Sequence, residues 1–365
     1  MTCALFIIEQ PLGNRTFYLN LRRYIEPLPN LEAKWVEVSY FNDPKRFWER
    51  FPLIPKRLHG RLVGRAQVRQ GLLRNPHDAT LFHTQSAAAL GGELVFQKPY
   101  IISMDITPIQ HDALYGAYGH PVDRNPWIQH YKHQKTLRLY QHAARLLPFS
   151  NWMKDSLVSD YQVDPDRIEV IPPGIDLDQW LPDRLPHQSP VRILFVGGDF
   201  YRKGGDILLD AFRRLPAGQA ELTLVTKSVM KSEPGVTVLT HLKPNTPEMI
   251  FLFRSSDIFV FPTRADSFGI AAVEASAAGL PVVAAQVGAI QEIVVNGETG
   301  FVIPPDSPEA LAQTLYRLIG DPELRLRLGQ AGRRHAELHF DGAKNAARTA
   351  QLLVDASHPH SLKQM

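Results

Sequence analysis

Residues 257–285 read DIFVFPTRADSFGIAAVEASAAGLPVVAA, where two short apolar runs flank a segment with helical spacing. The runs DIFVFP (257–262) and LPVVAA (280–285) have the length and composition of buried strands. We expect Ser267 to cap the intervening helix and Gly279 to follow its last turn. A strand, a helix and a second strand in this order predict one unit of a doubly wound parallel sheet.

The start of this helix has the character of an anion-binding site. The backbone N–H groups of Phe268, Gly269 and Ile270 would have no partner within the helix, and a helix N-terminus attracts phosphate. Gly269 has no side chain, so a phosphate or a sugar can approach its backbone closely. We therefore expect these three amides to hold a ligand that carries phosphate or sugar groups.

Two carboxylates belong to the same segment. Glu274 lies on the helix among residue types that are usually buried, where a carboxylate needs a partner. The two vicinal hydroxyls of a ribose would supply two hydrogen bonds. Asp266, just before the helix, is placed to accept from other hydroxyls. The alternative is structural: Asp266 and Ser267 cap the helix, and Glu274 bonds a backbone group or an arginine.

The alternation of strands and helices runs through the whole chain. In the first half, strands are expected at ALFII (4–8), KWVEVSY (34–40), ATLFHT (79–84), YIISMD (100–105) and ARLLPFS (144–150). In the second half, further strands are expected at VRILFVGG (191–198), ELTLVT (221–226) and VTVLTHL (236–242). Between them lies a proline-rich stretch without periodicity, which indicates a linker at 176–190.

The predicted fold class is therefore α/β, with two tandem Rossmann-like doubly wound domains that face a central cleft. The domains cover residues 1–175 and 191–340, and we expect a C-terminal helix at 341–360 to complete the first. In such sheets, ligands bind beyond the carboxyl ends of the strands. The residues of the site should therefore lie in the loops that follow the strands.

Composition favours a cytoplasmic globular protein. The chain has 365 residues, 44% of them hydrophobic and 21% charged, and a single cysteine, Cys3. One cysteine excludes an internal disulfide and a cysteine-based metal cluster, which fits a reducing compartment. No apolar stretch has the length and purity of a membrane span. His130 and His133 lie one helical turn apart but have no third ligand at suitable spacing, so no metal site is expected.

The net charge of +3 is unevenly distributed. Residues 1–150 carry 19 Lys/Arg and 11 Asp/Glu, so this half has a charge of +8 and the remainder −5. Residues 45–74 are rich in arginine, and Arg57, Arg61, Arg65 and Arg69 recur every four positions among leucines. This pattern suits a surface helix with a solvated basic face, or peripheral attachment to an anionic membrane at the cytoplasmic face. The segment has no aromatic-interleaved basic motif of the kind that binds nucleic acid, so no nucleic-acid partner is expected.

The central segment resembles the signature of family 4 glycosyltransferases of the two-domain GT-B fold. That signature is a glutamate, seven residues and a second glutamate, with Phe-Gly inside and Glu-Ala-Met/Ser-Ala at its end. This chain has Asp266, seven residues and Glu274, with Phe268-Gly269 inside and Glu274-Ala275-Ser276-Ala277 at the end. The resemblance is strong across 190–340 and continues more weakly through 1–190.

The resemblance implies a role for each residue of the motif. Glu274 would bind the ribose of a nucleotide, and Asp266 would face the donor sugar. The amides of Phe268, Gly269 and Ile270 would hold the sugar and the diphosphate. The family usually has glutamate at the position of Asp266, so the carboxylate here is on a shorter side chain.

A second family feature follows the strand at 191–198. The usual form is Gly-Arg-Leu, three residues and Lys-Gly, and this chain has GGDFYRKGGDILLDAF (197–212). Lys203 matches the lysine that neutralises the diphosphate. Gly198 stands where the family has arginine, and we expect Arg202 to supply that charge from another place. Fixed cations would stabilise the charge that a leaving diphosphate gains.

The N-terminal half resembles the family less closely. Gly13 stands in the position of the first glycine of a phosphate-binding loop, with Asn14 in place of the second. Asp105 follows the strand at 100–105, where the family has a histidine at the catalytic site. By that resemblance Asp105 would contact the donor sugar near the reacting carbon. Residues 111–120 are expected to help form an acceptor pocket.

The predicted function is transfer of a hexose from a nucleoside diphosphate sugar to an unidentified hydroxyl acceptor, with retention of anomeric configuration. Asp105, Asp266 and Lys203 are the expected catalytic residues, and no metal or other cofactor is expected. Retention without an obvious covalent nucleophile favours attack on the face that the diphosphate leaves, with that phosphate as the base. Two alternatives remain open: a sugar-nucleotide epimerase of the same architecture, and a non-catalytic protein of the membrane surface.

Overall fold

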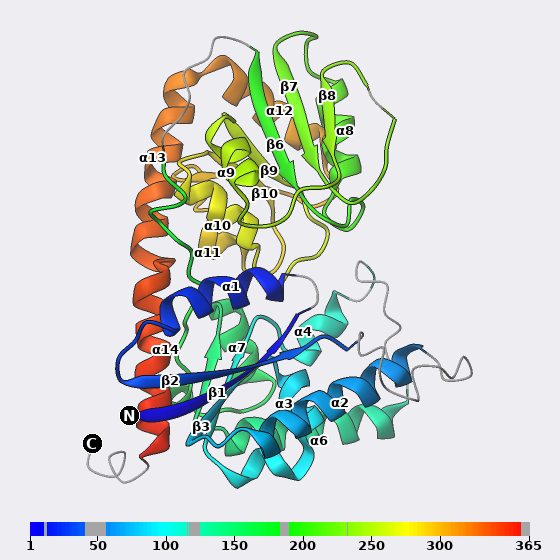
Figure 1. The fold of residues 1–365 in the computed structure, drawn as a ribbon. Coiled ribbons are helices and arrows are strands. Elements are labelled where there is room, and N and C mark those ends of the chain that lie inside the picture. Colours follow the sequence, from blue (N-terminus) through cyan, green and yellow to red (C-terminus); the bar gives the residue numbers. More distant parts are fainter. Residues whose placement is uncertain are drawn as a thin grey trace. The chain divides into compact units, whose positions relative to one another are not determined.

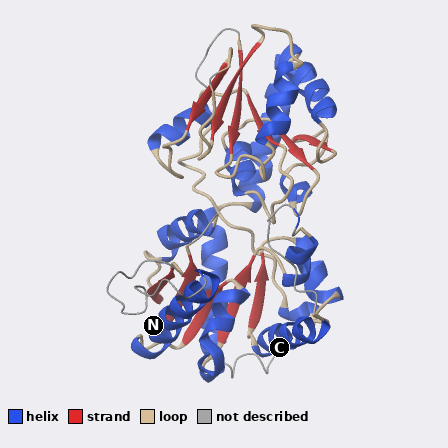
Figure 2. Ribbon diagram, turned by 90° about the vertical axis from the view of Figure 1, so that its right-hand side faces the viewer, coloured by secondary structure: helices blue, strands red, loops and turns tan. Residues whose placement is uncertain are grey.

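The computed structural model divides the chain into two compact units, each an α/β sandwich around a parallel sheet (Figures 1 and 2). The first unit comprises residues 1–110, 122–173 and 343–365, and the second comprises 111–121 and 174–342. The structure describes residues 1–10, 13–40, 56–114, 116, 125–182, 190–231 and 233–358. The predicted α/β class with two parallel sheets is confirmed.

The first unit has a five-stranded parallel sheet in the order β2-β1-β3-β4-β5. Its strands are β1 (Thr2–Glu9), β2 (Leu31–Val38), β3 (Ala79–His83), β4 (Tyr100–Met104) and β5 (Arg145–Pro148). The connecting helices are α1 (Asn14–Ile25), α2 (Lys56–Arg74), α3 (Gln85–Gly91), η2 (Gly92–Gln97), α4 (Pro108–Ala113), α6 (Pro126–His142), α7 (Asn151–Ser159) and η3 (Pro165–Arg167). Strands β3 and β4 are buried along their whole length, as expected for mainly apolar strands in the interior of a parallel sheet.

Helix α2 packs on the first sheet through glycines. A Cβ at Gly64 would lie 2.7 Å from the ring of Tyr40, and one at Gly71 would lie 2.9 Å from Val36. The helix therefore approaches β2 closely, and the valines Val63 and Val68 complete its buried face. Leu58, Leu62 and Leu73 lie outside this face and are exposed, whereas Leu72 is half-buried and packs against the core.

The second unit has a six-stranded parallel sheet in the order β11-β10-β9-β6-β7-β8. Its strands are β6 (Val191–Val196), β7 (Ala220–Val225), β8 (Val236–Leu239), β9 (Ile258–Phe261), β10 (Val282–Ala285) and β11 (Gly300–Ile303). Its helices are α8 (Gly205–Arg213), α9 (Pro247–Arg254), α10 (Ile270–Ala277), α11 (Ile290–Ile293), α12 (Pro308–Gly320) and α13 (Pro322–His339). The strand order reverses between β6 and β9, which is where doubly wound sheets bind ligands.

The C-terminal helix α14 (Gly342–Ser357) belongs to the first unit from residue 343 onward. Arg348 donates to Glu169 at 2.7 Å, and Asn345 donates to the carbonyl of Pro172 at 3.1 Å. Of the expected linker, 183–189 lies outside the described residues. Residues 176–182 belong to the second unit, where Trp180 is fully buried with its ring 5.0 Å from that of Phe253.

Candidate functional site

Helix α10 begins two residues later than the sequence suggests. Gly269 is its N-cap residue and has a φ of +100°, so the helix starts at Ile270. The expectation that Ser267 is the cap is therefore wrong. Its carbonyl instead accepts from the N–H of Ala289 at 3.2 Å, which ties the turn to the loop after β10. The left-handed conformation at Gly269 makes this arrangement possible, because a side chain there would be strained. Gly279, with a φ of +73°, follows the C-cap residue as predicted.

Glu274 is the most unusual residue of this helix. Its side chain is buried, with 7% of the residue exposed, and burial raises its pKa to about 8. Among the described residues, none donates a hydrogen bond to its carboxyl group or forms an ion pair with it. The structural alternative, in which Glu274 bonds a backbone group or an arginine, is therefore not found in the described part of the chain. A buried carboxyl group without a partner is unfavourable for folding, and such groups are typical of functional sites.

Lys203 and Asp266 lie together at the carboxyl edge of the second sheet. Lys203 is in the turn between β6 and α8, and Asp266 follows β9, the neighbouring strand. The ammonium group of Lys203 donates to Asp266 Oδ2 and lies 4.9 Å from the ring centre of Phe261. Burial lowers the pKa of Lys203, while the negative charge of Asp266 opposes this. The structure thus brings together two of the three residues predicted to be catalytic.

The turn that carries Lys203 packs directly on the end of β9. Gly204 has a φ of +75°, and a Cβ there would lie 1.9 Å from the carbonyl oxygen of Pro262. Only glycine allows this approach, because the atom met is rigid backbone. The close approach sets the position of Lys203 relative to the loop with Asp266. It explains why a glycine is needed directly after Lys203.

Arg202 is held differently from Lys203. Its guanidinium donates to the carbonyl of Ala265 at 2.8 Å, and its Nε lies 3.5 Å from Asp199. The side chain is mostly buried. It therefore braces the loop before Asp266 and places its charge beside that loop. Gly198, where the family has arginine, lies near the aliphatic part of Lys227, with 3.8 Å between a Cβ at this position and Lys227 Cε.

Arg264 joins three loops at this edge and was not singled out from the sequence. It makes a paired contact with Asp206 at 2.7 and 2.8 Å, donates to Asp306 at 2.6 Å and to the carbonyl of Tyr201 at 2.6 Å. Burial opposes ionisation of Asp206, but the hydrogen bonds and charge of Arg264 lower its pKa overall. Arg264 is therefore the residue that fixes the loop carrying Arg202 and Lys203. A single arginine after a strand gives no signal of this in the sequence.

Arg264→Met is expected to lower the free energy of unfolding by about 2 kcal/mol, because charged hydrogen bonds of this kind contribute ~1.5–3 kcal/mol each and part of that is offset by relaxation. Urea denaturation followed by circular dichroism measures the change. Arg213→Met is the matched control, since the Arg213–Glu233 pair is more exposed and should contribute less than about 1 kcal/mol. Equal losses in the two variants would contradict the bracing role.

In the first unit, Asp105 follows β4 and lies near a second carboxyl group, that of Glu9. Glu9 ends β1 and is buried. It accepts hydrogen bonds from Tyr40 and, at 2.9 Å, from Thr84. Burial raises its pKa to about 7, the bond from Thr84 opposes this, and the charge of Asp105 adds to it. The sequence reasoning missed Glu9, although a glutamate that ends a buried strand is itself a signal.

Two further predicted parts of the site are Gly13 and the acceptor segment 111–120. Gly13 is the residue before α1, with a φ of −69°, and a Cβ there would meet no atom within 4 Å. Its own packing therefore does not require glycine. In the segment 111–120, residues 115 and 117–120 lie outside the described residues. The structure accordingly does not test the predicted acceptor pocket.

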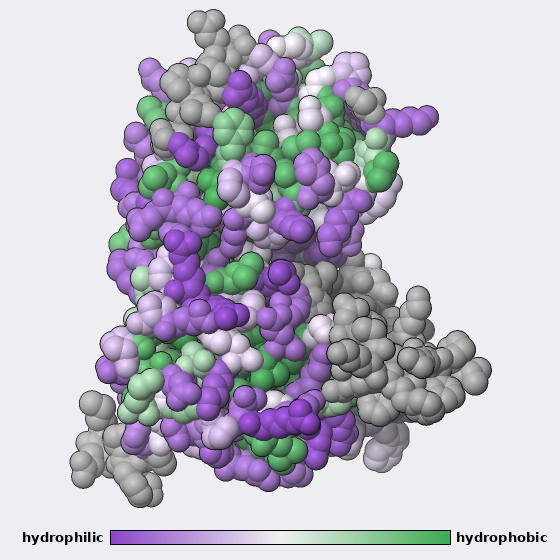
Figure 3. All heavy atoms as spheres, in the orientation of Figure 1, coloured by the Kyte–Doolittle hydropathy of each residue, from purple (hydrophilic) through white to green (hydrophobic). Residues whose placement is uncertain are grey.

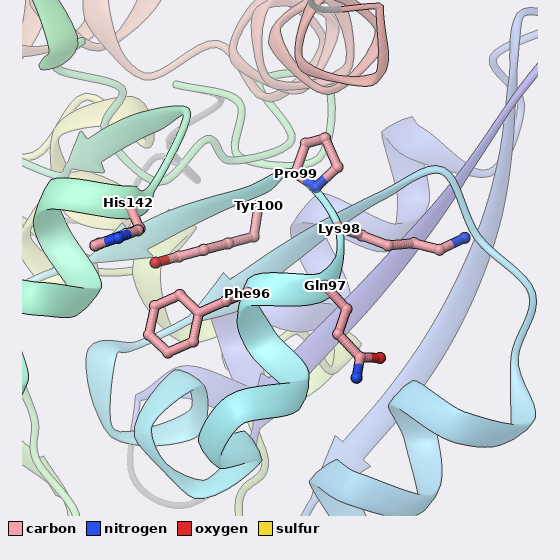
Figure 4. Close-up of a pocket in the computed structure, with 6 residues that line it drawn as sticks. All are labelled: Phe96, Gln97, Lys98, Pro99, Tyr100 and His142. Atoms are coloured by element: carbon pink, nitrogen blue, oxygen red, sulfur yellow. The ribbon is translucent and has the colours of Figure 1, made fainter.

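A shallow hollow of the first unit lies away from these groups. It is lined by Phe96, Gln97, Lys98, Pro99, Tyr100 and His142 (Figure 4). Tyr100 begins β4, so the hollow is at the amino edge of the sheet, whereas ligands bind at the carboxyl edge. The hydroxyl of Tyr100 donates to the carbonyl of Leu139 at 2.7 Å. The side chain of Lys98 points away from the aromatic rings of Phe96, Tyr100 and His142. We do not assign a ligand to it.

The described residues contain no group of three or more His, Cys, Asp or Glu side chains that could hold a metal ion. Within the same residues, no helix has the length and hydropathy needed to cross a bilayer.

Family models match both halves of the chain. The model described as Glycosyltransferase Family 4 matches residues 27–179, and the model described as Glycosyl transferases group 1 matches residues 180–335. A D-inositol 3-phosphate glycosyltransferase of Arthrobacter sp. (strain FB24) is 28% identical over 330 residues, or 84% of this chain and 76% of its own length. The protein of the same name from Corynebacterium glutamicum (strain R) is 34% identical over 55% of this chain and 54% of its own.

Solved structures have the same fold. Sucrose-phosphate synthase from Thermosynechococcus elongatus has a TM-score of 0.75 at 18% identity and covers 96% of this chain and 98% of its own. Anabaena Alr3699/HepE in complex with UDP-glucose has a TM-score of 0.72 at 18% identity, over 97% of this chain and 100% of its own. The chain has two α/β units, each with a parallel sheet, and a glycosyltransferase family model matches each half of it. It therefore belongs to the family 4 glycosyltransferases and is a glycosyltransferase of the GT-B fold.

Proposed function

We propose that this glycosyltransferase moves a hexose from a nucleoside diphosphate sugar to a hydroxyl acceptor with retention of configuration. The observation that carries the proposal is Glu274, a buried carboxyl group without a partner among the described residues, on the helix that Gly269 opens. The relatives named above are glycosyltransferases, and solved structures of the same fold hold UDP or UDP-glucose. A nucleoside diphosphate sugar contains a ribose that would satisfy such a carboxylate.

In this proposal most of the donor-binding residues belong to the second unit, and Gly13 belongs to the first. Glu274 accepts hydrogen bonds from the two ribose hydroxyls. The backbone amides of Phe268, Gly269 and Ile270 hold the sugar and the diphosphate at the start of α10. The set of donor-binding residues is completed by Gly13, Arg202, Lys203 and Asp266.

The chemistry proposed for the site is electrostatic. The diphosphate gains negative charge as the glycosidic bond breaks, and the ammonium group of Lys203 would stabilise that charge. In the structure, this ammonium group donates a hydrogen bond to Asp266. Asp266 would then turn to the sugar hydroxyls, and Asp105 would contact the sugar near the reacting carbon. The acceptor hydroxyl gives its proton to the leaving phosphate, so the proposal needs neither a covalent carboxylate nor a metal.

We propose a cytoplasmic location, in keeping with the single cysteine of the chain. A location at the inner face of the membrane depends on the surface of α2 and is argued separately below.

The direct test is to incubate the protein with UDP-, GDP- and ADP-sugars and to measure the release of the nucleoside diphosphate. Release that increases with added hydroxyl acceptors, and a product whose anomeric configuration matches the donor by NMR, would support the proposal. An epimer formed from the donor alone would show a sugar-nucleotide epimerase instead. If calorimetry found no binding of UDP, GDP or ADP, the assignment of Glu274 as a ribose ligand would be wrong.

A further inference from the structure

The exposed face of α2 alternates leucines with arginines. Leu58 and Leu62 are 51% and 46% exposed, and Arg61 and Arg65 are exposed beside them. These four positions have the spacing of one helical face. The face opposite them is the glycine and valine face that packs on the sheet. The leucines are therefore displayed to the outside among cations, which is not how an ordinary surface helix is built.

A second exposed apolar group lies at the start of α6. Trp127 is 84% exposed and Tyr131 is 58% exposed, and Ile128 lies between them on the same turns. The ammonium group of Lys135 lies 4.6 Å from the ring centre of Tyr131. The first residues of α6, 126–132, are all exposed, so this end of the helix extends beyond the body that it packs on.

The two groups lie on one face of the first unit. Helices α2 and α6 both pack against α3, which lies between them (Figure 1). Each helix runs back from the carboxyl edge of the parallel sheet, so both begin at that edge. Apolar and hydrophilic side chains lie side by side over the first unit in Figure 3. We call the seven side chains the docking face: Leu58, Arg61, Leu62, Arg65, Trp127, Ile128 and Tyr131.

The charged side chains of α2 and α6 are all basic. Neither α2 nor α6 contains an aspartate or a glutamate. Over the described residues, Arg61 and Arg65 take part in no ion pair or hydrogen bond. Other cations of the two helices are used within the fold: Arg138 pairs with Glu93 at 2.7 Å, and Arg69 donates to the carbonyl of Gly91 at 3.3 Å. The two arginines next to the exposed leucines are thus open to an outside partner.

We propose that the docking face binds the headgroup region of an anionic lipid bilayer. Leucine side chains enter the boundary of the acyl chains, tryptophan and tyrosine prefer the interface, and arginines bind lipid phosphates. A nucleic acid would bind the arginines but would leave the leucines exposed to water. A second copy of the chain would bring arginine against arginine. Of these three partners, the bilayer alone complements both the charge and the apolar side chains.

This inference goes beyond the donor chemistry and extends the surface expected from 45–74. Of that segment, 45–55 lies outside the described residues, and the side chains of α6 were not part of the expectation. The face shares no residue with the proposed donor site. A protein that releases nucleoside diphosphate but does not bind vesicles, or the reverse, would therefore separate the two proposals.

The test is flotation of the full chain with vesicles of phosphatidylcholine, alone or mixed with phosphatidylglycerol. We expect binding to the anionic vesicles only, with weaker binding as NaCl rises. Each arginine near the surface supports binding, so Arg61→Gln/Arg65→Gln should lower the partition coefficient by about tenfold or more. Leu58→Gln/Leu62→Gln should lower it by about tenfold as well, with the charge unchanged. Nucleotide release without an acceptor should stay at the level of the unchanged protein.

Two controls make the test specific. Leu326→Gln/Leu338→Gln removes two leucines of the second unit that are at least as exposed, and it should not change vesicle binding. Trp127→Phe should remove the blue shift in tryptophan emission that anionic vesicles cause. Equal binding to both kinds of vesicle, no binding to either, or full binding by the arginine double variant would overturn the proposal. Retention of DNA, or a dimer that Leu58→Gln/Leu62→Gln dissociates, in the absence of vesicle binding would assign the face to those partners.

Discussion

Glu274→Gln is expected to weaken UDP binding strongly while making the donor-free protein less sensitive to alkaline pH. The carboxylate is proposed to accept two hydrogen bonds from the ribose, and charged hydrogen bonds contribute ~1.5–3 kcal/mol each. The amide keeps the size of the side chain but loses the charge. We expect the affinity for UDP to fall about thirtyfold or more. Titration calorimetry with UDP measures this directly.

The pH dependence follows from the raised pKa of Glu274. Its pKa is about 8 in the folded protein, against 4.5 for an unperturbed glutamate side chain. Between these values the folded state holds a proton that the unfolded state releases, so stability falls as pH rises. Each pKa unit corresponds to about 1.36 kcal/mol, and the loss between about pH 5 and pH 8 is therefore up to about 4 kcal/mol. Glu274→Gln removes this dependence.

Thermal denaturation at about pH 5 and about pH 8.5 checks the expectation. The variant should gain stability relative to the unchanged protein at the higher pH, whatever the constant effect of the amide. Glu298→Gln, at an exposed position of the same unit, is the control and should follow the unchanged protein. A parallel pH dependence of Glu274→Gln and the unchanged protein would show that Glu274 is already ionised. Proton release on UDP binding, seen as heats that differ between buffers, should also vanish in Glu274→Gln.

Lys203→Ala should lower kcat for donor cleavage about a hundredfold, because removal of one fixed group that stabilises developing charge costs ~10²–10³ in rate. The ammonium group is held by Asp266 and the ring of Phe261, so its position is already set before the donor binds. Circular dichroism establishes that the variant is folded. Steady-state release of nucleoside diphosphate then gives kcat and KM separately.

Two further variants separate the role of Lys203 from that of its partner. Lys203→Ala leaves Asp266 without its cation, and this alone could slow the reaction by repelling the diphosphate. Lys203→Ala/Asp266→Asn removes both charges, and we expect it to stay as slow as Lys203→Ala. Lys231→Ala removes an exposed lysine of the same unit and should change kcat less than twofold. Recovery of the rate in the double variant would show that Lys203 only neutralises Asp266.

The fold could be read from local patterns because most of the strands contain a short, mainly apolar run. The strands at 79–83, 100–104 and 282–285 lie where the apolar runs of the sequence predict them, with small differences at the ends. The last strand, β11, was missed. Its residues Gly300–Ile303 follow a turn of polar residues and are only partly buried. Such a short edge strand is stabilised by its pairing with β10, which the sequence does not show.

The motif residues were also readable, since spacing fixes which of them share a helix. Asp266, Phe268, Gly269 and Glu274 were identified from one stretch, and Lys203 from another. What the spacing could not provide was the turn before the helix, because Gly269 rather than Ser267 begins it. The conformation of a glycine depends on the segments packed around it, which here are the end of β9 at Phe261 and the start of α11 at Ile290.

By itself, the sequence determined the class of sheet, the order of its elements and the residues of the donor motif, because these depend on periodicity and on neighbours along the chain. Only the tertiary structure decided which groups meet. It placed Lys203 against Asp266, made Arg264 the brace of their loops, and left Glu274 buried without a partner among the described residues. It also turned Leu58 and Leu62 of α2 outward, because the glycines allow a closer approach to β2 than leucines would. Contacts between distant segments depend on packing, and no local pattern encodes them.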